Sequence, residues 1–129
     1  MDFYYRHIEN VMQSLGIDQY VYEAVFINAS LNQSIEIYAY NEFYFLVGVE
    51  YHLEEKQRGF TLILGENDIL ELDSDASIKN AIHTEHFTGK ISISLSPYGN
   101  ISGDGNLQNP LNGKCVLNFI RVTPTNTKQ

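Results

Sequence analysis

The hydrophobic period of this chain changes near Gly16, and this change constrains the fold more than any other feature of the sequence. Before Gly16, the apolar residues keep the spacing of one stripe along an α-helix, and Asp2 is a suitable residue to cap its start. The stripe consists of Tyr4, Ile8, Val11, Met12 and Leu15. After Gly16, apolar and polar residues alternate, as is typical of half-buried β-strands. We therefore expect a helix over residues 2–15, with strands after it.

The rest of the chain contains about seven segments with the composition of strands. They are rich in Tyr, Phe, Val and Ile and are separated by charged or Gly- and Asn-rich turns. The segments are residues 20–28, 34–40, 44–53, 59–64, 69–73, 90–96 and 114–122. They predict an α+β protein, mainly antiparallel β, with the N-terminal helix packed on a curled sheet or half-barrel of about seven strands. The 129 residues suit a single domain over residues 1–122 with a flexible C-terminal tail over residues 123–129.

Residues 34–53 are predicted to form a β-hairpin whose turn decides which side chains face solvent. A two-residue turn at Asn41-Glu42 would leave both faces apolar, whereas a three-residue loop over residues 41–43 separates the side chains by type. We prefer the three-residue loop. It places Ile35, Ile37, Ala39, Phe45, Val47 and Val49 on one face, and Glu36, Tyr38, Tyr40, Tyr44, Leu46, Glu50 and His52 on the other.

The face with tyrosines and carboxylates is the leading candidate for a binding surface. Tyrosine offers a large apolar area with a polar tip, and carboxylates beside it attract Lys and Arg. Eight of the nine tyrosines lie within residues 1–51. The alternative is that the first helix packs on this face, so that the tyrosines are ordinary packing residues.

Glu23 interrupts the apolar strand predicted over residues 20–28. An inward carboxylate at this position would be an ionisable group in the core, which would indicate function. The preferred interpretation places Val21, Glu23 and Val25 on the outer face, and Tyr20, Tyr22, Ala24 and Phe26 inward.

The net charge of −8 arises in the first three-fifths of the chain. Residues 1–75 hold 14 acidic and 3 basic residues, including the acidic run Glu66, Asp68, Glu71, Asp73 and Asp75. This balance disfavours binding to nucleic acids and to anionic membranes, because both are negatively charged. It suits a basic protein partner.

The sequence contains no recognisable catalytic, metal or cofactor motif. Cys115 is the only cysteine, so no internal disulfide forms, and the start of the chain has no apolar signal segment; we expect a cytoplasmic protein. His83 and His86 lack further ligands at a metal-binding spacing. We therefore predict no enzyme activity, no metal and no cofactor.

The first part of the chain resembles the start of type III secretion chaperones. The resemblance covers residues 1–64 and consists of a short helix that ends at Leu15-Gly16, predicted twisted strands and an acidic pI. It implies a chaperone that binds a protein partner. Those chaperones usually carry a second substantial helix late in the chain, where this sequence predicts strands.

Together these observations predict an acidic module that recognises a basic protein partner, in an immunity-like, antitoxin-like or chaperone-like role. The predicted partner-binding residues are Glu36, Tyr38, Tyr40, Tyr44, Glu50, Glu66, Asp68, Glu71, Asp73 and Asp75. The alternative is a β-barrel that binds a small apolar ligand, with Tyr and Phe side chains around a cavity.

Overall fold

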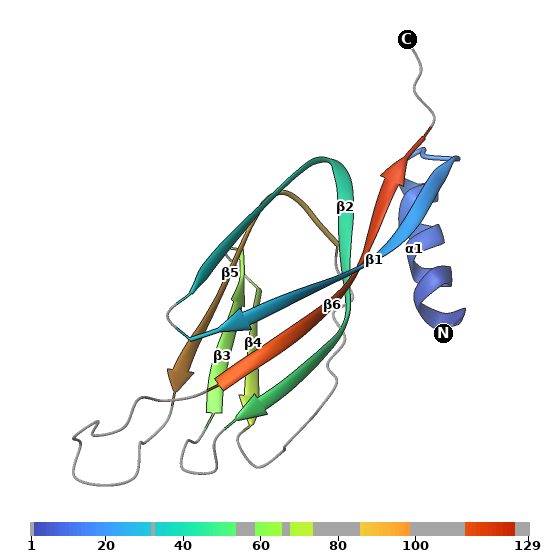
Figure 1. Ribbon diagram of the computed structural model, residues 1–129. Helices are drawn as coiled ribbons and strands as arrows, with labels where there is room; N and C mark the ends of the chain where they lie inside the picture. The colour runs from blue at the N-terminus through green and yellow to red at the C-terminus, as the bar shows by residue number, and fades with distance from the viewer. Residues whose placement is uncertain are drawn as a thin grey trace, which may run out of the picture.

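A computed structural model shows an open, antiparallel six-stranded sheet with one short helix (Figure 1). The structure describes residues 2–31, 33–53, 59–65, 68–73, 86–98 and 113–125. The elements are α1 (Asp2–Ser14), β1 (Tyr20–Ser30), β2 (Ser34–Leu53), β3 (Gly59–Leu64), β4 (Asp68–Asp73), β5 (His86–Tyr98) and β6 (Gly113–Pro124). The expected helix and the mainly antiparallel sheet are confirmed.

The strand order is β1-β6-β2-β5-β3-β4, so β1 and β4 lie at the two edges. Six strands are found among the described residues instead of about seven; their sheet is not closed, and the predicted half-barrel is not confirmed. The difference arises because two predicted strands, residues 34–40 and 44–53, form the single 20-residue strand β2. Strand β6 also extends to Pro124, and the Thr125 N–H donates to the Gln19 carbonyl, so residues 123–125 of the predicted tail join the fold. Residues 126–129 lie outside the described part.

The hairpin predicted around residues 41–43 is wrong, because residues 34–53 form one strand that arches over there (Figure 1) and whose two parts do not pair with each other. Its first part pairs with β5 from Ser34 to Ala39, and its second part pairs with β6 from Phe43 to Leu53. The Thr88 hydroxyl donates to the carbonyls of Ala39 and Glu42, at 2.9 and 3.0 Å, and so ties the bend to β5. These bonds hold residues 39–42 against β5, so the segment stays part of the sheet and does not form a separate turn.

Two irregularities along β2 change which side chains face the core. The first lies between Ala39 and Tyr44, and the second between Leu46 and Gly48. Each interrupts the alternation of side chains, as β-bulges do. Gly89 lies opposite Ala39 and has a φ of 76°, a left-handed conformation that glycine adopts without strain.

The main core lies on the concave side of the bent sheet. All six strands contribute to it, with Phe60, Leu62, Ile91, Leu117 and Phe119 among its most buried members. Because both halves of β2 contribute core side chains, the two halves of the sheet pack against each other as well as through their hydrogen bonds. The apolar area removed from water provides the main stabilisation.

Helix α1 packs on the outer side of β1, β6 and the second part of β2 (Figure 1). Ile8 and Met12 are buried there against Phe45, Ile120 and Val122, in a cluster separate from the main core. Each such buried side chain contributes roughly 1.5–3 kcal/mol of transfer free energy. The predicted packing of the helix on the sheet is thus found. We call this outer surface under α1 the covered face.

Candidate functional site

The outer side of the other half of the sheet carries several of the predicted binding residues. Glu36 and Tyr38 of β2 lie opposite Ser92 and Lys90 of β5, and their neighbours Ile35 and Ile37 turn toward the core. The same side continues across β3 and β4, because Thr61 lies opposite both Ser96 and Glu71. We call this surface the uncovered face. It consists of Glu36, Tyr38, Tyr40, Thr61, Ile63, Ile69, Glu71, Lys90, Ser92, Ser94 and Ser96.

Tyr38 and Tyr40 are the most prominent side chains of the uncovered face. They are 54% and 70% exposed, although tyrosine is a side chain that folding usually buries in part. Their rings lie side by side, with centroids 5.9 Å apart and planes tilted by 36°. Together they present a broad exposed aromatic surface. This part of the predicted face is exposed as expected.

Glu36 is held beside these tyrosines by two polar contacts. Its Oε2 lies 2.8 Å from Lys90 Nζ, and the Tyr38 hydroxyl donates to its Oε1 at 3.1 Å. The hydrogen bond from Lys90, followed by that from Tyr38, lowers the pKa of Glu36 below its ordinary value. The same contact with Glu36 raises the pKa of Tyr38. The carboxylate is therefore ionised and oriented, but Lys90 already neutralises it.

The acidic run reaches the uncovered face through strand β4. Glu71 is exposed there, next to Ile69, which is 57% exposed. The sequence predicts that the acidic run and the residues of β2 bind one partner, but it does not single out Ile69. The pairing of β3 with both β4 and β5 places Glu71 and Ile69 on the same face as Glu36. Asp68 and Asp73 lie in β4, but their side chains are outside the described part, as are Glu66 and Asp75 altogether.

The expectation that Tyr44 faces solvent is wrong. Its side chain is only 5% exposed and packs edge-to-face against Phe119, with centroids 5.6 Å apart. The irregularity after Ala39 is the reason, because Ala39 and Tyr44 both face the core although an odd number of positions separates them. Burial raises the pKa of Tyr44. Leu46, predicted on the same exposed face, is also buried.

Glu50 is exposed but does not join the uncovered face. It lies opposite Val116 in the second part of β2, while its neighbours Val49 and Tyr51 turn into the main core. Beyond the bend, this outer side belongs to the half of the sheet that carries α1. The predicted binding residues of β2 are thus divided among an exposed group, a buried tyrosine and a distant carboxylate.

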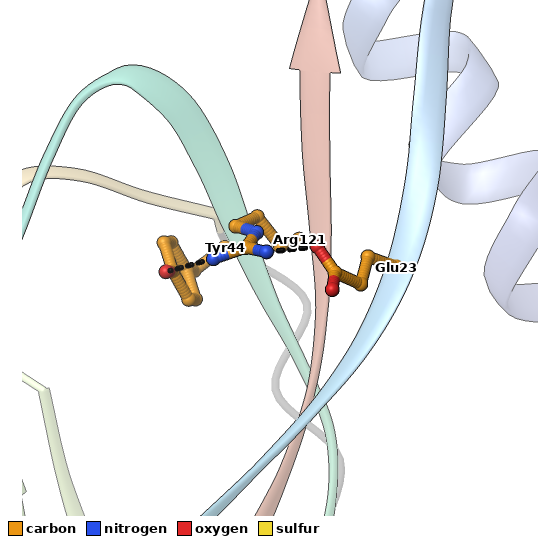
Figure 2. A network of polar contacts seen from close by, with 3 residues as sticks. All are labelled: Glu23, Tyr44 and Arg121. Carbon is orange, nitrogen blue, oxygen red and sulfur yellow. Dashed lines mark hydrogen bonds and ion pairs between the residues drawn. The ribbon is translucent and has the colours of Figure 1, made fainter.

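A polar row crosses β1, β6 and β2 at the end of the main core (Figure 2). Glu23 lies opposite Arg121, and Arg121 lies opposite Tyr44. Arg121 forms an ion pair with Glu23, and its Nη1 donates to the Tyr44 hydroxyl at 3.5 Å. Figure 2 shows the guanidinium between the two partners. The row therefore gives Glu23 a structural role, as the ionic partner of Arg121.

The expected orientation of β1 is wrong at Val25 and Phe26. Val25 packs against the main core, whereas Phe26 is 66% exposed. Tyr22 is also exposed, although its ring contacts both Tyr5 of α1 and Tyr20. Tyr20, also predicted to face inward, packs in the cluster under α1 on the outer side, and Glu23, predicted to face outward, shares the side of Val25.

The described residues contain no group of three or more His, Cys, Asp and Glu side chains that would hold a metal ion. His86 lies between the rings of Phe43 and Phe45, and His83 is outside the described part. Cys115 is 1% exposed, and burial raises the pKa of its thiol to about 12, so the reactive thiolate is disfavoured. In the part of the chain that the structure describes, no helix is both long and apolar enough to cross a membrane.

Comparisons with known proteins show no family for this chain. No family model matches it, and no curated protein is similar to it. Among solved structures, it is similar to a chain from work described as "Bacillus endospore appendages form a novel family of disulfide-linked pili". The two share 13% sequence identity, with 83% of this chain and 90% of that chain covered and a TM-score of 0.44. A likeness of this size carries no inference about function.

Proposed function

We propose that the protein is a protein-binding module whose uncovered face recognises a basic protein partner. The observation that carries this proposal is the exposed pair Tyr38 and Tyr40 beside the carboxylate of Glu36. Exposed aromatic side chains that touch each other are costly to leave in water and are enriched where proteins bind proteins. A role as an immunity protein, an antitoxin or a chaperone in the cytoplasm is part of the same proposal.

Arginine and lysine are the partner groups that such a surface favours. A guanidinium stacks on the face of a tyrosine ring, and a nearby carboxylate accepts its hydrogen bonds in a bidentate arrangement. Glu71 adds a second exposed carboxylate on the same face. The net charge of −8 attracts a basic partner over a longer range and speeds the encounter.

The ion pair between Glu36 and Lys90 is compatible with this mode of binding. Both side chains are about half exposed, at 45% and 53%, and an exposed ion pair of this kind contributes little to stability. An incoming arginine that binds Glu36 through two hydrogen bonds can therefore displace Lys90 at low cost.

The test is to capture partners from the native host on the immobilised protein and to measure the association rate of any captured protein at low and high salt. We expect a basic partner whose association slows as salt increases. Glu36→Gln should weaken binding, and Glu50→Gln is the matched control, because Glu50 lies on the same strand but off the uncovered face. An association rate that is independent of salt would contradict the proposal.

The alternative of a ligand-binding barrel remains a sequence-based prediction. The six described strands have two open edges, so they do not close into a barrel, and nothing among the described residues favours a small ligand.

A further inference from the structure

The two edges of the sheet differ sharply in how well they are protected. Strand β4 has 6 residues, of which Asp68, Glu71 and Asp73 are acidic, and a short, charged edge deters the addition of another strand. Strand β1 has 11 residues with no proline, and Glu23 is its only charged residue. As far as the structure describes the chain, β1 therefore has neither the short length nor the several charges that protect β4.

Strand β1 is also regular enough for another strand to pair with its free edge. It pairs with β6 without interruption from Tyr20 to Ser30, and no described strand pairs with its other edge. Along an extended strand, part of the backbone N–H and C=O groups then points away from β6. Two large apolar side chains accompany this edge, Val21 at 53% and Phe26 at 66% exposure.

We propose that the free edge of β1 pairs antiparallel with β1 of a second copy of this chain. A second copy fits this edge despite the acidic net charge of the chain, because Glu23, the only charged residue of β1, already has Arg121 as its ionic partner and the apolar residues of β1 can pair with themselves. Self-pairing therefore adds backbone hydrogen bonds without bringing an unpaired charge into the contact. It also joins the two sheets around a two-fold axis, which closes the assembly as a dimer.

The side chains of β1 suit a two-fold axis at Phe26. In that register Phe26 lies opposite Phe26 of the second copy, and Val25 lies opposite Ile27. Cross-strand pairs of aromatic or β-branched side chains are favourable in antiparallel sheets. Glu23 lies opposite Ala29, so six positions separate the two Glu23 residues along the ladder. That distance, about 20 Å, exceeds the screening length at physiological salt, which is about 8 Å.

The first test is the molar mass of the full chain, measured by sedimentation and light scattering over a series of concentrations. We expect a monomer–dimer equilibrium. Phe26→Lys should raise the dimer dissociation constant by about tenfold or more, because it replaces the central aromatic pair with two like charges. Leu15→Lys is the matched control, since Leu15 is an exposed apolar residue directly after α1 and lies on neither β1 nor the uncovered face, and it should leave the equilibrium unchanged. A chain that stays monomeric at its highest soluble concentration, or equal effects of the two variants, would overturn the proposal.

A cysteine experiment tests the pairing without altering Phe26. Ala24 and Asn28 are exposed and lie opposite each other across the proposed axis, so a mixture of Ala24→Cys and Asn28→Cys chains should form a disulfide-linked dimer on mild oxidation. Neither variant alone should form this dimer, because the two introduced cysteines of a dimer would then lie about 14 Å apart along the paired strands. Cys115 is buried and does not compete. Failure of the mixture to cross-link would overturn the proposal. The uncovered face takes no part in either experiment, so these results are independent of the proposed partner binding.

Discussion

The covered and uncovered faces are the two halves of the outer side of one bent sheet, and they differ in whether a helix packs on them. The covered face has apolar side chains, such as Phe45 and Ile120, and α1 shields them through Ile8 and Met12. The uncovered face alternates tyrosines and carboxylates with small serines, and no described element packs on it (Figure 1). The comparison teaches that α1 shields the outer side chains around Phe45, whereas no described element shields Tyr38 and Tyr40.

The largest expected effect is on stability at the covered face. Met12→Ala should lower the free energy of unfolding by about 2–5 kcal/mol, because Met12 is fully buried between α1 and the sheet. Chemical denaturation measures this effect. Tyr40→Ala on the uncovered face should stay within about 0.5 kcal/mol of the wild type. If both variants lost equal stability, the difference between the faces would not hold.

The next effect is on binding at the uncovered face. Replacing both Tyr38 and Tyr40 with Ala should cost about 2 kcal/mol of binding free energy for a captured partner, because exposed aromatic side chains become buried in the complex. Titration calorimetry measures the change. Tyr5→Ala is the control, since Tyr5 is an exposed tyrosine on α1, and it should bind as the wild type does. A partner that tolerates the double variant must bind elsewhere.

A smaller effect is expected at Tyr44, which links the core to the polar row of Figure 2. Tyr44→Phe should lower the free energy of unfolding by about 1 kcal/mol or less, because the hydrogen bond from Arg121 is long and Arg121 keeps its ion pair with Glu23. Thermal denaturation measures the loss. Partner binding should be unchanged, and a selective loss of binding in a fully folded variant would place Tyr44 in the binding surface after all.

The smallest effect concerns the ionisation of Glu36. Lys90→Gln should raise the pKa of Glu36 toward its ordinary value, since the hydrogen bond from Lys90 is the main cause of its lowering. A carboxylate with a lowered pKa adds stability above its unfolded-state pKa, and this stability is lost as the pH falls through its folded-state pKa. The variant should therefore lose slightly less stability on acidification than the wild type. Side-chain NMR titration measures the pKa, and an unchanged value would show that the ion pair does not form in solution.

Part of the candidate site follows from local pattern alone. Residues 34–40 alternate cleanly, so the exposure of Glu36, Tyr38 and Tyr40 and the inward direction of Ala39 were predictable from the sequence. Tyr44 was not, because its direction depends on a register shift that only the pairing partners of β2 reveal. The sequence also did not predict that Glu71 and Glu36 lie on the same face, because β5 and β3 lie between their two strands in the sheet.

By itself, the sequence determined the elements: one amphipathic helix, antiparallel strands and an acidic surface with an aromatic group near residue 38. These features follow from local periodicity and charge, which act over a few residues. Only the tertiary structure decided that residues 34–53 form one bent strand and that α1 covers one half of the sheet. Those outcomes depend on hydrogen bonds and packing between segments distant in sequence, such as Thr88 with Ala39 and Ile8 with Phe45.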